Sequence, residues 1–267
     1  RPVLTKCQRS SQIELSDPIR PDQPPLVSIL MPAHNAQVWM SRAIRSVRDQ
    51  RSPDWELLIV DDASDDATGA LARSAAAQDA RIRVLTAPRR LGAAEARNMA
   101  LAHAQGRFIA FLDTDDTWHP DKLHLQIRFM CETGAALSYT GFWRVRGAHR
   151  HEVRVPAEIT RKRLLRGNVI GCLTAIYDSH AFGKVPMPSL PLRHDYALWL
   201  DLLSRSGSAR GLTRPLATHF RRKGSLSSNR LHALFATWRI YRRHAALGRA
   251  SAAMCLSSHV IGRMLRG

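Results

Sequence analysis

The stretch Phe108-Ile109-Ala110-Phe111-Leu112-Asp113-Thr114-Asp115-Asp116 decides how the rest of the chain is interpreted. Its apolar part is too short for an independent helix and follows Gly106 and Arg107, which predicts a buried parallel strand whose carboxyl end reaches solvent. Ligands of open α/β sheets bind at such ends. In an extended chain Asp113 and Asp115 would point to the same side, about 6.6 Å apart, and repel each other. A Mg²⁺ or Mn²⁺ ion, which prefers oxygen ligands and phosphates, would relieve that repulsion.

The same stretch also has a purely structural interpretation. Asp116 or Thr117 would cap a helix that begins near His119, because such side chains accept hydrogen bonds from the first helical turn. An isolated Asp-x-Asp motif does not decide between a helix cap and a cation site. The surrounding sequence must decide.

Length and composition indicate a globular protein. A chain of 267 residues with 45% hydrophobic residues can bury a substantial core. The four cysteines lie far apart without paired metal-ligand spacing, which argues against a disulfide framework or a zinc site. No apolar run approaches the roughly 20 residues that cross a bilayer, and the N-terminus lacks the apolar core of a secretory signal. We therefore expect a cytoplasmic protein with free thiols.

The net charge of +18 is concentrated in the second half of the chain. Residues 1–140 contain 17 basic and 17 acidic side chains, whereas residues 141–267 contain 23 basic and 5 acidic ones. After Asp201 the chain has 13 Arg or Lys residues and no Asp or Glu. The positive field of this region favours an anionic partner. The candidates are a membrane surface, a phosphate-bearing acceptor and nucleic acid. The alternative is a cationic surface that only keeps the protein soluble.

Three further segments have the character of buried strands, at residues 26–31, 55–60 and 81–85, and they alternate with helical patterns. Four strands alternating with helices predict a parallel, doubly wound sheet with right-handed crossovers. The first strand is expected to break at Pro32, and the second is followed by acidic residues from Asp61. The glycine-rich signatures of dinucleotide-binding and P-loop enzymes are absent.

Four blocks in order resemble the family 2 inverting glycosyltransferases: Val27 to Ala36, Glu56 to Ser64, Gly92 with Ala96-Arg97-Asn98, and Phe111 to Asp116. The resemblance implies the GT-A fold, a parallel-rich nucleotide-binding α/β sheet flanked by helices and joined to an acceptor-binding part. We expect an extended leader over residues 1–25 and a GT-A domain over residues 26–225. The nucleotide-sugar half of that domain would span residues 26–135 and the acceptor half residues 136–225. A basic helical C-terminal extension would follow over residues 226–267.

The resemblance also implies how the nucleotide is held. The turn of Pro32, Ala33 and His34 would contact the nucleotide. Asp62 would read the base, with Asp61 as the closest alternative. Many relatives have Tyr at the position of His34, so stacking on the base would be weaker here or sensitive to pH near neutrality.

A second group of residues would hold the phosphates and the sugar. Arg97 is expected to face the nucleotide or its phosphates. Asp113, followed by Thr114, would contact the ribose or the metal, and Asp115 would hold the cation that bridges the diphosphate. Asp116 would either orient the sugar or cap the following helix.

Glycosyl transfer also needs a base for the acceptor hydroxyl. Asp195 opens a predicted helix with an apolar face of Leu198, Trp199, Leu202 and Leu203. The family has a Glu-Asp pair here whose Asp is the base, whereas His194 precedes Asp195 in this chain. One such base implies direct displacement with inversion, and the structural alternative is an Asp that favours the helix dipole. Residues 186–191 are interpreted as an acceptor-side loop, and residues 167–172 as cavity lining or a strand entry.

The basic C-terminal region has two helical patterns, over residues 231–246 and 250–265. Arg221, which precedes them, would close over the donor diphosphate or remain solvated, together with Arg222 and Lys223. The helices are basic and moderately amphipathic, which favours peripheral attachment to an anionic membrane on its cytoplasmic face. The alternative is that they pack on the catalytic domain with their arginines outward.

The leading hypothesis is a metal-dependent inverting glycosyltransferase of cell-envelope polysaccharide synthesis. It would use Mn²⁺ or Mg²⁺ and move a sugar from a nucleotide-diphosphate sugar, with UDP favoured, to a hydroxyl of a glycan or lipid-linked acceptor. A basic nucleic-acid-binding protein is the second hypothesis, but it leaves the carboxylates at the strand ends unexplained. A sugar nucleotidyltransferase is the third, but the Gly-rich, Lys-bearing loop expected after the first strand is absent.

Overall fold

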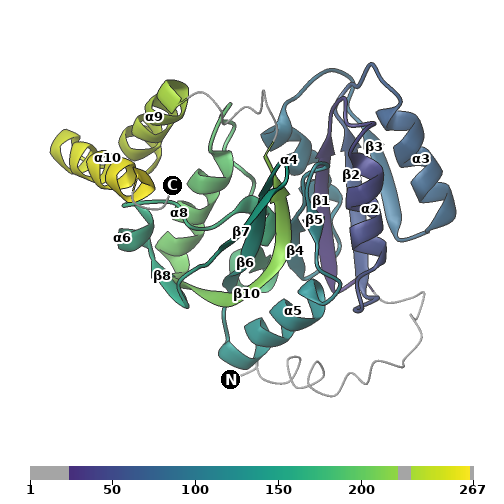
Figure 1. Ribbon diagram of the computed structural model, residues 1–267, viewed down its shortest axis with the longest axis horizontal. Helices are drawn as coiled ribbons and strands as arrows, with labels where there is room; N and C mark the ends of the chain where they lie inside the picture. Colours follow the sequence, from purple (N-terminus) through teal and green to yellow (C-terminus); the bar gives the residue numbers. More distant parts are fainter. Residues whose placement is uncertain (1–23, 222–229, 265–267) are drawn as a thin grey trace.

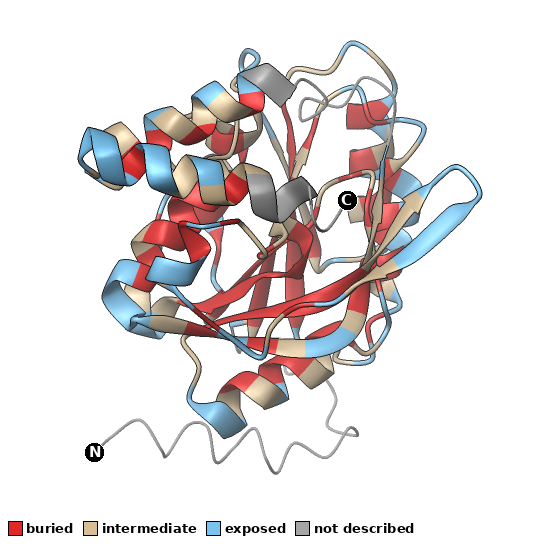
Figure 2. Cartoon of the chain, turned by 60° about the vertical axis from the view of Figure 1, so that its left-hand side comes forward, coloured by how far each residue is buried: buried red, intermediate tan, exposed pale blue. Residues whose placement is uncertain are grey.

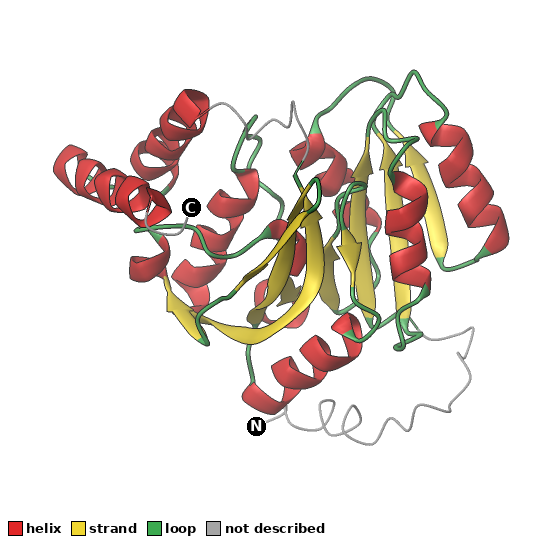
Figure 3. Ribbon diagram, in the orientation of Figure 1, coloured by secondary structure: helices red, strands yellow, loops and turns green. Residues whose placement is uncertain are grey.

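The computed structural model describes residues 24–221 and 230–264 (Figure 1). Within those ranges one ten-stranded sheet runs through the molecule in the order β3-β2-β1-β4-β9-β6-β10-β5, with β7 paired to β6 and β8 paired to β10. Helices cover both faces of this sheet (Figure 3). The expected leader at residues 1–25 falls almost entirely outside the described residues, so it stays a prediction.

The first half of the chain forms the predicted parallel sheet. Its strands are β1 (Val27–Ala33), β2 (Trp55–Asp61), β3 (Ile82–Thr86) and β4 (Phe108–Phe111), all paired in parallel. Its helices are α2 (Met40–Arg48), α3 (Thr68–Gln78) and α4 (Ala93–His103). The expected break at Pro32 is wrong, because Pro32 and Ala33 stay in register with Val60 and Asp61. The strand ends before His34.

The second half adds strands of both directions. The elements in order are β5 (Thr117–Trp118), α5 (Lys122–Thr133), β6 (Leu137–Arg146), β7 (His149–Val153), β8 (Glu158–Thr160), α6 (Arg161–Leu164), η1 (Cys172–Thr174), β9 (Ile176–Asp178), α7 (Ser179–Phe182), α8 (His194–Ser206) and β10 (Ser208–Phe220). A helix capped by Asp116 or Thr117 is therefore wrong. The residues after Asp116 form β5, and α5 begins only at Lys122, because β5 pairs with β10.

Strand direction places several strand ends at one edge of the sheet. β9 is antiparallel to both β4 and β6, so these two reversals make β6 run in the same direction as β4. β10 is parallel to β6. The carboxyl ends of β1, β2, β3, β4, β6 and β10 therefore lie at the same edge, which we call the carboxyl edge.

The sheet separates two apolar cores, and alternate residues of a strand contribute to each. On β1, Leu30 belongs to the core that includes α8, whereas Ile29 and Met31 belong to the core under α2. These side chains are at most 1% exposed, and each contributes about 2 kcal/mol to folding. The buried centre of the molecule is visible in Figure 2.

The C-terminal region forms helices, as predicted, and packs on the rest of the molecule. Its elements are α9 (Arg230–Arg239), the π-helical segment η3 (Ile240–His244) and α10 (Arg249–Met264), beside α6 and α8 in Figure 1. The Tyr241 hydroxyl donates to the Leu165 carbonyl at 2.5 Å, and Ile240 and Tyr241 are buried in the core that contains α8. In the part of the chain that is described, no helix combines the length and apolar character needed to cross a bilayer.

Candidate active site at the carboxyl edge

Packing between β4 and α8 brings together two of the carboxylates singled out from the sequence. Phe111 on β4 packs edge-on against Trp199 on α8, with ring centroids 5.6 Å apart. Asp113 lies two residues beyond Phe111, and Asp195 lies one helical turn before Trp199. The Phe111–Trp199 contact therefore holds Asp113 and Asp195 at the same end of the molecule.

Arg97 on α4 connects the segments that carry these two carboxylates. Its side chain is 4% exposed, and Nη2 donates to Asp113 Oδ1. Nη1 lies 2.8 Å from Nε2 of His194, the residue before Asp195. Burial opposes the charge of Arg97, but the carboxylates of Asp113 and Asp195 raise its pKa above the usual value. Arg97 is thus a permanent buried cation between the predicted metal site and the predicted base.

His194 is held as a neutral imidazole. Its Nδ1 lies 3.3 Å from the Leu190 carbonyl, so Nδ1–H donates to that oxygen and Nε2 accepts from Arg97. Burial lowers the pKa of His194, and the charge of Arg97 lowers it further. A neutral acceptor satisfies Arg97 without adding a negative charge beside Asp195.

Asp116 is an anchor for β10. Its side chain is 3% exposed, and Oδ1 accepts from the Phe220 amide at 3.1 Å and lies 3.1 Å from His219 Nδ1. Burial raises the pKa of Asp116 to about 6, against the opposing effect of His219. Burial lowers the pKa of His219, but Asp116 raises it overall, and Arg144 opposes that rise. A contact of Asp116 with the sugar stays a prediction.

The loop from Asp113 to Asp116 is partly exposed. Arg42 Nη2 donates to the Asp115 carbonyl at 3.0 Å, and the Arg42 guanidinium lies 3.7 Å above the Phe220 ring. Thr114 is buried, whereas the Asp113 side chain is 35% exposed. No described group of three or more His, Cys, Asp or Glu side chains forms a complete metal site. Two carboxylates suit a Mg²⁺ or Mn²⁺ ion that takes further ligands from phosphates and water.

The predicted nucleotide residues meet at the ends of β1 and β2. The Asp62 amide donates to the Ala33 carbonyl at 2.8 Å, and the Asp62 carbonyl lies 2.9 Å from His34 Nδ1. The Asp62 carboxylate accepts from the amides of Leu91 and Gly92 at 2.6 and 2.8 Å. Asp62 thus ties the His34 turn to the start of α4. Its contact with a base stays a prediction, as does that of half-buried Pro32.

Residues 186–191 form the expected irregular loop, and α4 anchors it. The Asn98 side chain donates to the Met187 carbonyl at 2.9 Å and accepts from the Met187 amide at 2.7 Å. Residues 167–172 lead through the short helix η1 into β9, which fits the expected strand entry, and a role in lining the cavity stays a prediction. Burial raises the pKa of the Cys172 thiol, Arg97 lowers it, and Asp113 and Asp195 raise it further.

Sequence reasoning missed several residues of this arrangement. Asn98 stood beside Arg97 in a recognised block, which was a usable signal. Arg42 and His219 gave none, because they meet the Asp113–Asp116 loop only after α2 and β10 have docked. Arg221 is exposed, and its amide donates to the Val145 carbonyl at 2.8 Å. Arg222 and Lys223 lie outside the described residues.

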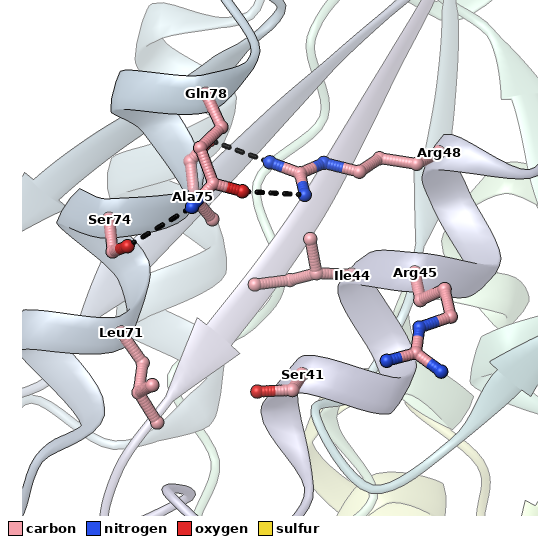
Figure 4. A pocket seen from close by; sticks show the side chains of 8 residues that line it. All are labelled: Ser41, Ile44, Arg45, Arg48, Leu71, Ser74, Ala75 and Gln78. Carbon is pink, nitrogen blue, oxygen red and sulfur yellow. Dashed lines mark hydrogen bonds between the residues drawn. The ribbon is translucent and has the colours of Figure 1, made fainter.

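A separate groove of about 250 Å³ lies between α2 and α3 (Figure 4). Arg48 reaches across it, and Nη2 donates to the Ala75 carbonyl at 2.8 Å. None of its eight lining residues is a predicted site residue. The groove is therefore not part of the candidate site.

Comparison with known proteins gives concordant matches. The model of glycosyl transferase family 2 matches residues 28–183. TuaG of Bacillus subtilis, named for teichuronic acid biosynthesis, is 39% identical over 86% of this chain and 93% of its own. WfgD of Escherichia coli, named as a UDP-Glc:α-D-GlcNAc-diphosphoundecaprenol β-1,3-glucosyltransferase, is 36% identical over 80% of this chain and 84% of its own. The crystal structure of S. aureus TarS 1–349 with UDP-GlcNAc superimposes with a TM-score of 0.68 at 20% identity, covering 88% of this chain and 71% of that one.

Proposed function

The chain belongs to glycosyl transferase family 2 and has a GT-A fold, and on this premise we propose that it is an inverting glycosyltransferase of cell-envelope polysaccharide synthesis. The proposed donor is a UDP-sugar, and the proposed acceptor is a hydroxyl of a lipid-linked glycan. One observation supports this most strongly: buried Arg97 joins Asp113 to the His194-Asp195 segment. A donor-phosphate site and a base are then parts of one site.

Asp195 acts as the base in this proposal. It lies in the first turn of a 13-residue helix, and its carboxylate takes the proton of the acceptor hydroxyl as that oxygen attacks the anomeric carbon. The bond between the anomeric carbon and the diphosphate oxygen breaks on the opposite side, so the configuration inverts. The reaction needs no second nucleophile.

Arg97 would hold the departing diphosphate directly, and Asp113 and Asp115 would act on it through a divalent cation. Arg97 supplies a fixed positive charge in a water-poor setting, where electrostatic stabilisation is strong. Asp113 and Asp115 would hold Mn²⁺ or Mg²⁺, which when bound neutralises charge that develops on the leaving group. Asp62, Pro32, Ala33 and His34 would contact the nucleotide, and Thr114, Asp116 and Arg221 the sugar diphosphate.

The relatives support the choice of donor and acceptor. WfgD is named for UDP-Glc and for a diphosphoundecaprenol acceptor, and a second relative, 35% identical, has the same named activity. We therefore favour a UDP-sugar and a lipid-diphosphate acceptor. The nucleic-acid-binding and nucleotidyltransferase alternatives have no such support.

The test is a nucleotide-sugar screen with Mn²⁺ present, which follows nucleoside diphosphate release and product formation. Asp115→Asn and Asp195→Asn should each abolish turnover. Only Asp115→Asn should weaken UDP binding in titration calorimetry, because Asp195 does not hold the diphosphate. Equal UDP affinity in the two variants would contradict this division of roles.

The proposal includes peripheral contact with an anionic membrane through α9 and α10, on the cytoplasmic face. Phe235 and Met254 are each 66% exposed. Each lies two residues, or about 200° of helix, beyond a buried alanine, so both point away from the packed faces. Arg239 and Arg249 are exposed on the same two helices, and Arg243 is exposed on η3 between them, which suits anionic headgroups. Absence of binding to anionic vesicles at low salt would remove this part of the proposal.

A further inference from the structure

The hairpin of β6 and β7 presents one basic face toward its tip. Residues paired across antiparallel strands share a face, and so do residues two apart on one strand. Arg144 pairs with His151, and Arg146 pairs with His149. These four side chains therefore share a face of the hairpin, which we call the basic face. None of the four is acidic, and three of them, Arg146, His149 and His151, are exposed.

The opposite face of the hairpin has its own internal partners. Trp143 and Glu152 pair there, and so do Val145 and Arg150. The Arg150 guanidinium lies 4.0 Å above the Trp143 ring, and Glu152 lies 3.6 Å from Arg154. Cations on that face are compensated by an aromatic ring or a carboxylate. On the basic face the Arg144 guanidinium lies 5.5 Å from the Phe142 ring, and the residues that pair with Arg144 and Arg146 across the hairpin are histidines rather than acids. The face therefore carries positive charge that no cross-strand carboxylate offsets.

The basic face is continuous with the candidate active site. His219 on β10 pairs in register with Arg144 and so shares its face. The His219 imidazole contacts Asp116, and Arg144 is close enough to oppose the rise in the pKa of His219. β6 and β10 both end at the carboxyl edge, so the exposed tip of the hairpin projects beyond the edge at which the donor would bind (Figure 2).

We propose that Arg144 and Arg146 on the basic face bind the diphosphate of a diphosphate-linked acceptor. The inference rests on the proposed function and assigns a binding surface to its acceptor. A diphosphate matches the surface because charged hydrogen bonds from arginine to phosphate are strong and geometrically specific. The donor diphosphate has Arg97 and the Asp113–Asp115 loop. A second cationic surface next to that site suits the acceptor's own diphosphate.

The test compares two water-soluble acceptors without vesicles, an α-GlcNAc diphosphate with a short alkyl chain and the matching neutral alkyl glycoside. The double variant Arg144→Gln/Arg146→Gln should raise KM for the diphosphate acceptor about tenfold or more. The kcat value, the KM for UDP-sugar and the rate with the neutral glycoside should stay unchanged. Arg150→Gln, which removes a charge from the opposite face of the same hairpin, should have no effect.

Three outcomes would overturn the inference. An equal effect of Arg150→Gln would mean that only bulk charge matters. A rise in KM for UDP-sugar would assign the arginines to the donor diphosphate. An equal loss with both acceptors would mean a structural role. Calorimetry of the diphosphate acceptor separates this inference from the proposed function. If the acceptor binds through Arg144 and Arg146 but no sugar is transferred, the binding surface is retained and the proposed reaction is rejected. If sugar is transferred but binding does not depend on these arginines, the reaction is retained and the binding surface is rejected.

Discussion

Two arginine–aspartate pairs lie at opposite ends of β4 and differ in how they use the carboxylate. Just before β4, Arg107 contacts both oxygens of Asp178 at 2.6 to 3.1 Å, and Asp178 also accepts from the His180 amide at 2.9 Å. Beyond β4, Arg97 contacts Asp113 through one oxygen. Side-chain exposure is 11% for Asp178 and 35% for Asp113. The first pair closes the fold, whereas the second leaves the carboxylate accessible to a ligand.

The same contrast extends to other polar groups at the two ends of the sheet. Near the start of β1, the Ser28 hydroxyl donates to Glu56 at 2.6 Å and accepts from the Gly106 amide at 2.8 Å. Glu56 also accepts from Arg83 at 3.1 Å. These polar groups of the opposite end are bonded to one another. At the carboxyl edge the Asp113 side chain is 35% exposed, so it is available to a substrate.

Replacing each arginine by methionine should give the largest difference between the two ends of β4. Arg97→Met should lower kcat/KM by at least about 100-fold, since a fixed donor at the leaving group is lost. Arg107→Met should leave turnover per folded molecule unchanged and lower the free energy of unfolding by about 3 kcal/mol, because it leaves Asp178 unpaired. Steady-state kinetics and urea unfolding on both variants measure this. Comparable activity losses would show that both pairs are structural.

Adding one methyl group at each end of the sheet gives the next largest effect. A Cβ at Gly106 would lie 2.5 Å from the Ser28 backbone nitrogen, whereas one at Gly69 would lie 2.4 Å from a side-chain oxygen of Asp61. Gly106→Ala should destabilise the protein by about 1–3 kcal/mol, since backbone must shift.

Gly69→Ala should leave the melting temperature within a few degrees of the original. The cost of displacing the Asp61 side chain is offset by the higher helix propensity of Ala relative to Gly, which is about 1 kcal/mol. If Asp61 rather than Asp62 reads the base, Gly69→Ala will also raise KM for the donor. An unchanged KM would favour Asp62.

Lys122, like Asp178, is bonded only within the protein. Its replacement should therefore change stability and leave activity unaltered. It is fully buried, and Nζ donates to Gln126 at 2.5 Å and to the Thr174 carbonyl at 3.2 Å. Burial lowers the pKa of Lys122 to about 7 from 10.5. Between those pH values the unfolded chain binds a proton that the folded chain has released, so stability rises with pH, by up to about 1.4 kcal/mol per unit. Lys122→Met should remove this rise in urea unfolding measured from pH 7 to 9.5.

The smallest effect on activity concerns His194, which accepts a hydrogen bond from Arg97 and so supports the Arg97–Asp113 pair. His194→Ala removes the acceptor for Arg97 and should lower kcat about tenfold by allowing Arg97 to move. His194→Gln retains a neutral acceptor and should recover most of that loss. UDP affinity should change in parallel with kcat in both variants. No difference between Ala and Gln would exclude this positioning role.

Local patterns predicted much of the nucleotide half. The apolar strands at β1, β2, β3 and β4 and the helices after them were readable because hydrophobic periodicity and strand-end acids depend on neighbouring residues. The sequence was silent on β6 to β10, and it placed a helix start near His119 where β5 lies. β5, β6 and β8 pair with β10, and β9 pairs with β4 and β6. Most of these partners are far away in the chain, so no local signal reports them.

The sequence by itself determined the chemistry: the carboxylates after β4, the base candidate Asp195 and the uneven positive charge were all visible in residue order. Only the tertiary structure decided their arrangement. It placed Arg97 between Asp113 and His194, turned Asp116 into an anchor for His219 and Phe220, and put Arg144 and Arg146 on one face. Each of these depends on contacts between residues far apart in the chain, and packing sets such distances.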